Sequence, residues 1–519
     1  MSRLALPRVL VFLACTLPSF SARAAAPAIE DGTVITVNEG AVRGVAGRDA
    51  AVTVYKGIPY AAAPVGALRW KPPQPAPVWE GVRDASEFCA SCVQEIRRSY
   101  LPWTEEYMFR NDVSEDCLAL NIWTPARRAE ERLPVYVYIH GGAYYGGSGE
   151  VLLYDGEALA RKGVIVVTLN YRLGVFGFLA HPELTAESPH GSSGNYGLLD
   201  QIAALRWVRE NIAAFGGDPE RVTVGGQSAG AGSVHHLLVS PLARGLFQRA
   251  IAQSGPWRRG ASSPALAAAE KQGVEFATAI EAPELAALRA LPAETLFARY
   301  FGKSFFFRPI VDGWVVPEQV VSAHENGRQI DVPLLTGWTA DERSSRSGYG
   351  GTTRQEFAEQ AQREFGARAG AFLELYPAPD DAEAGAVQVQ AWRDADRAGL
   401  VWWAGERARH GRARDWTYIF ERAIPWPEHP EYGAFHSGEL PYTFNNLSLM
   451  DRPWEDVDHR LADLVSEYWA NFIKQGDPNA SGLPAWPEDN GTLMRLGATS
   501  AAEPALSPEK LAFHLAESR

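Results

Sequence analysis

Cysteine and methionine are scarce in this chain, with four of each among 519 residues. So few cysteines exclude a disulfide-dense fold but suffice for one bridge. The mature chain lacks a run of about 18 uncharged apolar residues, so we expect no membrane span. It also lacks a basic block, and 49 Lys and Arg against 62 Asp and Glu give a formal net charge of −13. An acidic chain of this kind is a poor ligand for polyanions, which argues against a nucleic-acid partner.

Apolar and aromatic residues are, in contrast, plentiful. Hydrophobic residues make up 46% of the chain and charged residues 21%, and there are 16 Trp, 18 Tyr and 22 Phe. These proportions are typical of globular proteins with large cores and exclude a mostly disordered chain. The length allows about three domains or one large α/β domain.

The N-terminus has the layout of a secretory signal peptide. Arg3 and Arg8 provide a positive start, residues 9–20 are mostly apolar, and an Ala-Arg-Ala cleavage site follows. We expect residues 1–24 to be removed, with cleavage as late as residue 26, and the protein to be exported to the periplasm or secreted. A membrane anchor is the alternative, but the apolar run is too short to cross a bilayer.

The rest of the chain alternates short apolar runs with helical patterns. Residues 199–215, for example, carry Ile202, Leu205, Val208 and Ile212 at helical spacing. Continuous apolar strands between helices predict an α/β fold with a large, mostly parallel central sheet, helices on both faces and helical insertions over the active site. The runs that read as strands are residues 134–139, 163–169, 221–224, 250–253, 332–336 and 416–420.

A G-x-S-x-G pattern occurs at residues 226–230, with Ser228 at its centre. A predicted strand precedes it, and residues 231–239 read as a helix. This context is typical of a nucleophile elbow, a sharp turn that exposes the serine above a sheet. The alternative is an ordinary glycine-rich turn.

An activated serine requires amide donors for the oxyanion of its tetrahedral intermediate. The residue after the nucleophile, Ala229, is one candidate. The sequence His-Gly-Gly-Ala at residues 140–143 follows a predicted strand, and such loops supply further amides in α/β-hydrolases. Gly142 and Ala143 are therefore the other candidates, against the alternative of a plain glycine turn.

The serine also needs a histidine base and a carboxylate to orient it. In α/β-hydrolases the acid follows the serine and the histidine follows the acid. Asp341 and Glu342 come after a predicted strand, and their spacing does not separate them. Among the later histidines, His436 lies in a loop of small residues and is the candidate base.

Several motifs together resemble those of the type-B carboxylesterase/lipase family, which includes the cholinesterases. The similarity extends from about residue 30 to about residue 490. The nucleophile motif and its upstream residues match the family's serine signature, and residues 115–123 resemble its second signature except at Ala119. Further matching segments are residues 55–61, 170–174, 195–201 and 476–479.

The resemblance implies a single α/β-hydrolase domain over residues 27–519. It implies Glu342 as the acid, His436 as the base, and the amides of Gly142, Ala143 and Ala229 as the oxyanion hole. It also implies a disulfide between Cys92 and Cys117. Cys89 lies where the family usually has no cysteine, and its pairing with Cys117 instead is chemically possible.

The expected activity is hydrolysis of a small-molecule carboxylic ester through a Ser-His-Glu triad, without a metal or organic cofactor. Gln227 and Tyr107 replace the glutamate and the choline-stacking tryptophan of cholinesterases, which weakens a cation site. The alternatives are the same machinery acting on amide, carbamate or lipid ester bonds, and a non-catalytic binding module. Trp257 and Arg258 are candidate pocket residues, and Arg258 with Arg259 could receive a carboxylate-bearing ester. The alternative is that these residues form a solvated loop.

Overall fold

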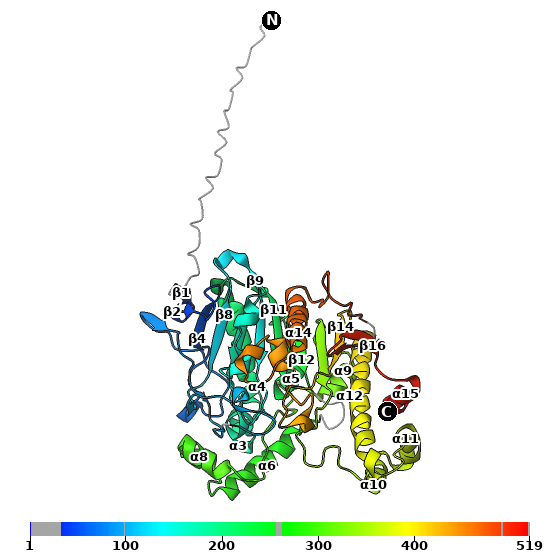
Figure 1. Ribbon diagram of the computed structural model, residues 1–519. Coiled ribbons are helices and arrows are strands. Elements are labelled where there is room, and N and C mark those ends of the chain that lie inside the picture. The colour runs from blue at the N-terminus through cyan, green and yellow to red at the C-terminus, as the bar shows by residue number, and fades with distance from the viewer. Residues whose placement is uncertain (2–32, 98, 256–261, 489–490, 517–519) are drawn as a thin grey trace.

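The computed structural model describes residues 1, 33–97, 99–255, 262–488 and 491–516. Within these ranges the largest element is an 11-stranded sheet in the order β16-β15-β14-β13-β12-β11-β9-β10-β8-β4-β3 (Figure 1). Its strands are β3 (Val45–Ala46), β4 (Thr53–Pro59), β8 (Ala119–Thr124), β9 (Leu133–Ile139), β10 (Ile165–Leu169), β11 (Gly217–Gln227), β12 (Arg249–Gln253), β13 (Leu334–Thr339), β14 (Asp415–Phe420), β15 (Thr492–Leu496) and β16 (Ala501–Pro504).

The sheet is mixed. Every pairing from β10–β9 across to β14–β15 is parallel. The outer pairings, β10–β8, β8–β4, β4–β3 and β15–β16, are antiparallel. The expectation of a parallel sheet is therefore correct for the central strands and wrong for the strands at both edges, which are antiparallel.

Helices cover both faces because the strands carry apolar side chains on both. In β9, Val135, Val137 and Ile139 join the core on the side of α4 (Tyr196–Asn211) and α5 (Ala229–Val239). The alternate side chains, Tyr136 and Tyr138, join the core on the side of α14 (Asp456–Gln475). This period of two follows from the pleat of a strand.

The predicted helical regions form two insertions that follow adjacent strands. The first lies between β12 and β13 and the second between β13 and β14, and Figure 1 shows parts of both at the lower end of the molecule. The first contains α6 (Leu266–Ala279), α7 (Leu285–Ala290), α8 (Ala293–Tyr300) and α9 (Val320–Glu325). The second contains α10 (Arg354–Phe365), α11 (Ala369–Leu375) and α12 (Asp381–His410).

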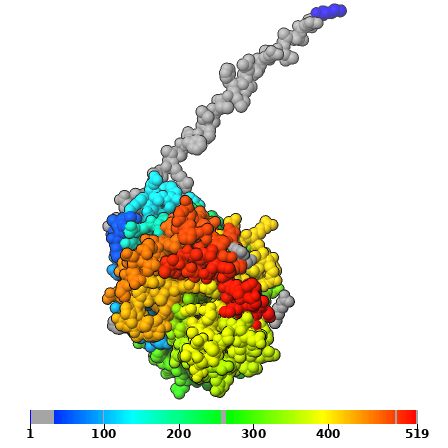
Figure 2. All heavy atoms as spheres, turned by 45° about the vertical axis from the view of Figure 1, so that its right-hand side comes forward, coloured from blue at the N-terminus to red at the C-terminus, as the bar shows by residue number. Residues whose placement is uncertain are grey.

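Smaller elements complete the fold. The C-terminal helix α15 (Pro508–Ala516) packs against α12, and the two segments adjoin at the surface in Figure 2. No helix in the described ranges combines the length and apolar character needed to cross a bilayer. The remaining elements are β1 (Val34–Val37), β2 (Gly40–Arg43), β5 (Val82–Asp84), β6 (Ser91–Cys92), β7 (Val113–Ser114), α1 (Glu157–Ala160), α2 (Gly174–Phe178), α3 (Pro182–Glu187) and α13 (Leu440–Thr443).

Candidate active site

Ser228 lies between the end of β11 and the start of α5. Its φ of 59° is in the region that side chains rarely adopt, so the turn is strained. Glycine is required on both sides of it. A Cβ on Gly226 would lie 2.5 Å from the carbonyl carbon of Gly230, and a Cβ on Gly230 would lie 2.1 Å from the oxygen of Ile139 at the end of β9. The motif glycines therefore let the serine turn pack directly against the neighbouring strand.

The three candidate oxyanion-hole residues, Gly142, Ala143 and Ala229, line cavities that Ser228 also lines. Gly142 and Ala143 follow β9 with φ values of 105° and 56°. Within the described residues, neither of their N–H groups donates a hydrogen bond. Ala229 is the first residue of α5, where amides have no partner inside the helix. Within the described residues, the amides of Gly142 and Ala143 therefore have no protein acceptor, and that of Ala229 has none inside its helix.

The candidate acid and the candidate base are brought together by a β-bridge. Asp341 pairs with Phe435, so the next residue on each segment, Glu342 and His436, are neighbours. His436 Nδ1 and Glu342 Oε2 share a hydrogen bond. The other oxygen of Glu342 accepts from Ser254 Oγ at 2.5 Å and from the Thr339 amide at 2.8 Å.

Asp341 has a different environment. Its carboxylate accepts hydrogen bonds from the Ala434 amide at 2.9 Å and from Tyr349 Oη at 2.8 Å, and it pairs with Arg393. These bonds tie together the two loops that carry Glu342 and His436. The carboxylate that faces the histidine is Glu342, which the sequence spacing alone could not decide.

The two partners shift each other's pKa. Burial alone raises the pKa of Glu342, but the charge of His436 and the hydrogen bonds to the carboxylate leave it below the ordinary value. Burial alone lowers the pKa of His436, but the charge and hydrogen bond of Glu342 leave it above the ordinary value. The imidazolium is therefore stabilised at this position.

Ser228 and His436 line the same two cavities. Within the described residues, no hydrogen bond joins them. Gln227 Nε2 instead donates a hydrogen bond to His436 Nε2 at 3.3 Å. Catalytic hydrogen bonds are commonly long without substrate and tighten when it binds.

Two neighbours of His436 were not anticipated from the sequence. Trp103 Nε1 donates to the His436 carbonyl oxygen at 3.1 Å. Glu439 is buried, accepts from Gln253 Nε2 at 3.1 Å, and has a pKa raised to about 7 by burial and then by the charge of Glu342. The only sequence signal for Glu439 is its position three residues after the candidate base.

The first cavity at Ser228, which we call the aromatic cavity, has a volume of about 480 Å³. Gly142, Ala143 and His436 also line it. Aromatic rings make up much of its wall, and Tyr107 is one of them. Arg97 and Glu95, which pair with each other, also line it. The side chains that define it are Tyr100, Trp103, Tyr107, Met108 and Tyr145.

The second cavity at Ser228, which we call the arginine cavity, has a volume of about 370 Å³. Ala143, Ala229 and His436 line it as well. Phe306 is exposed on its wall, whereas Phe307 is buried in the core. The side chains that define it are Tyr144, His236, Phe306, Arg308 and Arg346. The candidate pocket residues Trp257 and Arg258 lie outside the described residues.

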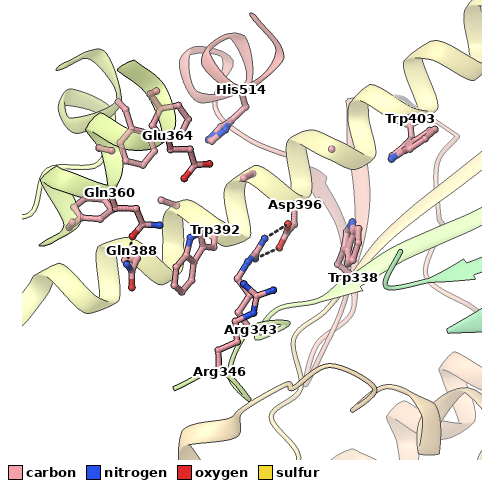
Figure 3. Close-up of a pocket in the computed structure, with 17 residues that line it drawn as sticks. Trp338, Arg343, Arg346, Gln360, Glu364, Gln388, Trp392, Asp396, Trp403 and His514 are labelled. Atoms are coloured by element: carbon pink, nitrogen blue, oxygen red, sulfur yellow. Dashed lines mark hydrogen bonds and ion pairs between the residues drawn. The ribbon is translucent and has the colours of Figure 1, made fainter. Parts of the chain in front are cut away.

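A third cavity, of about 510 Å³, lies between β13 and the second insertion, and Figure 3 shows its lining. Neither Ser228 nor His436 lines it, but Arg346 does. In the part of the chain that the structure describes, no group of three or more His, Cys, Asp or Glu side chains is arranged to hold a metal ion.

Cys92 and Cys117 form a disulfide, with an S–S distance of 2.08 Å, as the resemblance implies. Cys89 is unpaired and partly buried. Burial raises the pKa of its thiol to about 12, so it stays protonated. Its sulfur lies 3.5 Å from Asn170 Nδ2. The alternative pairing of Cys89 with Cys117 is therefore not the one formed.

Comparison with known proteins places this geometry in a family. Residues 31–514 match the model of the carboxylesterase family. A fumonisin B1 esterase of Sphingopyxis macrogoltabida is 38% identical, over 88% of this chain and 85% of that protein. A para-nitrobenzyl esterase of Bacillus subtilis is 38% identical over 89% and 94%, and a human cocaine esterase 33% identical over 90% and 88%. The chain belongs to the carboxylesterase family and is a carboxylic ester hydrolase.

Proposed function

We propose that the protein cleaves carboxylic esters through an acyl-enzyme, with Ser228 as nucleophile, His436 as general base and Glu342 as the acid that orients it. The hydrogen bond between Glu342 and His436 Nδ1, beside a serine held in a strand-to-helix turn, is the observation that carries the assignment. Family membership supports it independently.

In the first half of the reaction, Nδ1–H of His436 donates to Glu342, which leaves the Nε2 lone pair to accept the Ser228 proton. The serine oxygen attacks the ester carbonyl, and the oxyanion receives hydrogen bonds from the amides of Gly142, Ala143 and Ala229. Loss of one such donor typically slows an enzyme about 10²–10³-fold. His436 then gives its proton to the departing alkoxide, which leaves as the alcohol.

In the second half, His436 accepts a proton from water, and the resulting hydroxide attacks the acyl-serine carbonyl. The same amides hold the second oxyanion. Return of the proton from His436 to Ser228 releases the carboxylic acid and restores the site. Every proton is carried by His436, so its ionisation controls both halves.

The decisive experiment replaces Ser228 with alanine and measures hydrolysis of 4-nitrophenyl butyrate. We expect kcat to fall by about 10³-fold or more, because the nucleophile is lost. A fluorophosphonate probe should add its mass to the unaltered protein and not to the variant. Ser322→Ala, a change outside the site, is the control. Unaltered hydrolysis by Ser228→Ala would overturn the proposal.

We further infer that residues 1–24 direct export and that residues 27–519 act as one catalytic domain. The leader pattern and the Cys92–Cys117 disulfide support export, since disulfides persist in oxidising compartments. The spread of the site from Gly142 to His436 supports a single domain. N-terminal sequencing of the protein recovered from cell fractions tests export: an intact N-terminus in the cytoplasmic fraction alone would contradict it.

A further inference from the structure

The arginine cavity carries positive charge within reach of Ser228. Arg308 and Arg346 both line it, and they come from different parts of the chain. Arg308 follows the helices of the first insertion, and Arg346 follows Glu342 in the loop after β13. Their convergence on one cavity is a property of the fold.

Arg308 is held by its neighbours. Phe307 before it is buried, with its ring 5.2 Å from that of Phe276, and Pro309 after it lines the same cavity. Arg308 is partly buried as a residue, and its one side-chain hydrogen bond within the described residues is long and exposed, 3.4 Å from Nη2 to the Ser262 carbonyl oxygen. Most of its donors therefore remain available.

Arg346 is held through its backbone. Its amide donates to the Arg343 carbonyl oxygen at 2.9 Å, in the loop that Asp341 fastens to Ala434. The side chain is exposed, and its charge opposes protonation of His436, which lowers the pKa of that residue. The charge of Arg346 therefore acts on His436, and the side chain lines both the arginine cavity and the third cavity.

Two neighbouring arginines form salt bridges, whereas Arg308 and Arg346 form none within the described residues. Arg343 forms two hydrogen bonds with Asp396, and Arg393 pairs with Asp341. Figure 3 shows Arg343 joined to Asp396 by dashed lines, with no such line from Arg346. Within the described residues, neither Arg308 nor Arg346 forms a salt bridge, although the charge of Arg346 partly offsets the rise that burial causes in the pKa of Asp396.

The cavity offers little to compensate for this charge. Among its described lining residues, Glu342 is the one carboxylate, and it is buried and hydrogen-bonded to His436 and Ser254. An arginine fork matches a carboxylate with two parallel hydrogen bonds. The aromatic cavity, which Ser228 also lines, presents aromatic rings in contrast.

We propose that the preferred substrates are esters with a carboxylate on one side of the scissile bond, bound by Arg308 and Arg346, and an apolar or aromatic group on the other, bound in the aromatic cavity. Half-esters of dicarboxylic acids and acyl esters of hydroxy acids both have this chemistry. The proposal rests on ester hydrolysis at Ser228, and it adds the class of ester.

The test uses matched pairs of benzyl esters. Monobenzyl adipate carries the carboxylate, benzyl hexanoate has the same chain length without it, and release of benzyl alcohol gives kcat/KM for each. We expect the anionic ester to be preferred by about 10-fold or more. Benzoyl esters of 4-hydroxybutanoate and of butanol reverse the polarity and reveal which side bears the carboxylate. Preference for the anion in either pair supports the proposal.

The variants are Arg308→Gln, Arg346→Gln and their combination. Each single change should reduce the preference about 3–10-fold, the combination should abolish it, and Arg308→Lys should retain part. Lys303→Gln removes the same charge from an exposed site on the same segment and should leave both rates unchanged. Equal or better hydrolysis of both neutral esters, or equal losses on both esters in the double variant, would overturn the proposal.

Failure of the arginine proposal and failure of the esterase mechanism would give different results. If the arginine proposal is wrong, neutral esters are still hydrolysed and Ser228→Ala still abolishes that activity. If the esterase mechanism is wrong, Ser228→Ala hydrolyses both members of each pair as the unaltered protein does.

Discussion

The aromatic cavity and the arginine cavity meet at Ser228 but differ in origin. The wall of the aromatic cavity comes largely from residues 94–109, inside the loop closed by Cys92 and Cys117. The arginine wall comes from loops that precede and follow β13. Ala143, Ser228 and His436 line both cavities. The proposed catalytic residues Ser228 and His436 therefore lie where the two cavities meet, and the wall of each cavity can change substrate preference independently of the other.

The largest loss of activity should come from a change in the proposed catalytic residues that the two cavities share or contact. Glu342→Gln removes the charge that stabilises the His436 imidazolium, so kcat/KM should fall about 10²–10⁴-fold on neutral and anionic esters alike. Steady-state kinetics on both benzyl esters measures this. Equal losses support one catalytic centre for both esters, whereas a loss confined to one ester would show that the two esters do not share it.

Asp341→Asn is the matched control for that change. It alters the adjacent carboxylate, which contacts Ala434 and Arg393 and not the histidine. We expect a smaller loss of activity and a lower melting temperature, because the tie between the two loops is weakened. A larger catalytic loss from Asp341→Asn than from Glu342→Gln would reverse the assignment of the acid.

These two residues also show what the sequence could and could not supply. The apolar runs located the central strands, and the glycine pattern located Ser228, because both depend on local chain geometry. Sequence spacing could not distinguish Asp341 from Glu342, because the choice depends on the β-bridge between Asp341 and Phe435, which are far apart in the sequence.

The residues that line the two cavities were even harder to predict from the sequence. Arg308 and Arg346 lie in unrelated segments, and only tertiary packing brings them to one cavity. The sequence pointed instead to Arg258, outside the described residues. Similarly, strand β11 begins at Gly217, before the apolar run at 221–224, because Gly217 pairs with Leu133 of β9 across an irregularity in the register that ends at Val222.

The next effect is the pH dependence, which should be common to both cavities. Glu342 raises the pKa of His436, so the protonated, inactive base persists to higher pH than for an ordinary histidine. We expect kcat/KM to fall about 10-fold per pH unit below a midpoint that lies above 6.5. Profiles on the neutral and anionic esters should share this acid limb.

Glu439 offers a way to sharpen that profile. Its charge also raises the pKa of His436, so Glu439→Gln should move the acid limb to lower pH. A rate loss with no movement of the limb would instead indicate a purely structural role for this buried carboxyl.

A smaller effect should follow from a change in the aromatic wall alone. Met108 lines that cavity without a side-chain hydrogen bond to the triad within the described residues. Met108→Ala removes apolar contact with the bound benzyl group, so kcat/KM should fall about 3–10-fold on both benzyl esters. The ratio between anionic and neutral esters should stay constant. If the ratio changes as much as the rates do, the two walls are not independent.

The smallest effect should be that of salt on kcat/KM for the anionic ester. It tests the two arginines separately from the catalytic residues. Arg346 is exposed and Arg308 partly so, which leaves their attraction for a carboxylate open to screening. The Debye length falls from about 30 Å at 0.01 M to about 3 Å at 1 M. Raising NaCl across this range should therefore reduce kcat/KM for monobenzyl adipate about 2–5-fold and leave benzyl hexanoate nearly unchanged. The double variant Arg308→Gln/Arg346→Gln should lose this difference, since no charge remains to screen. Equal salt effects on the two esters in the unaltered protein would mean that the carboxylate is not held by exposed charge.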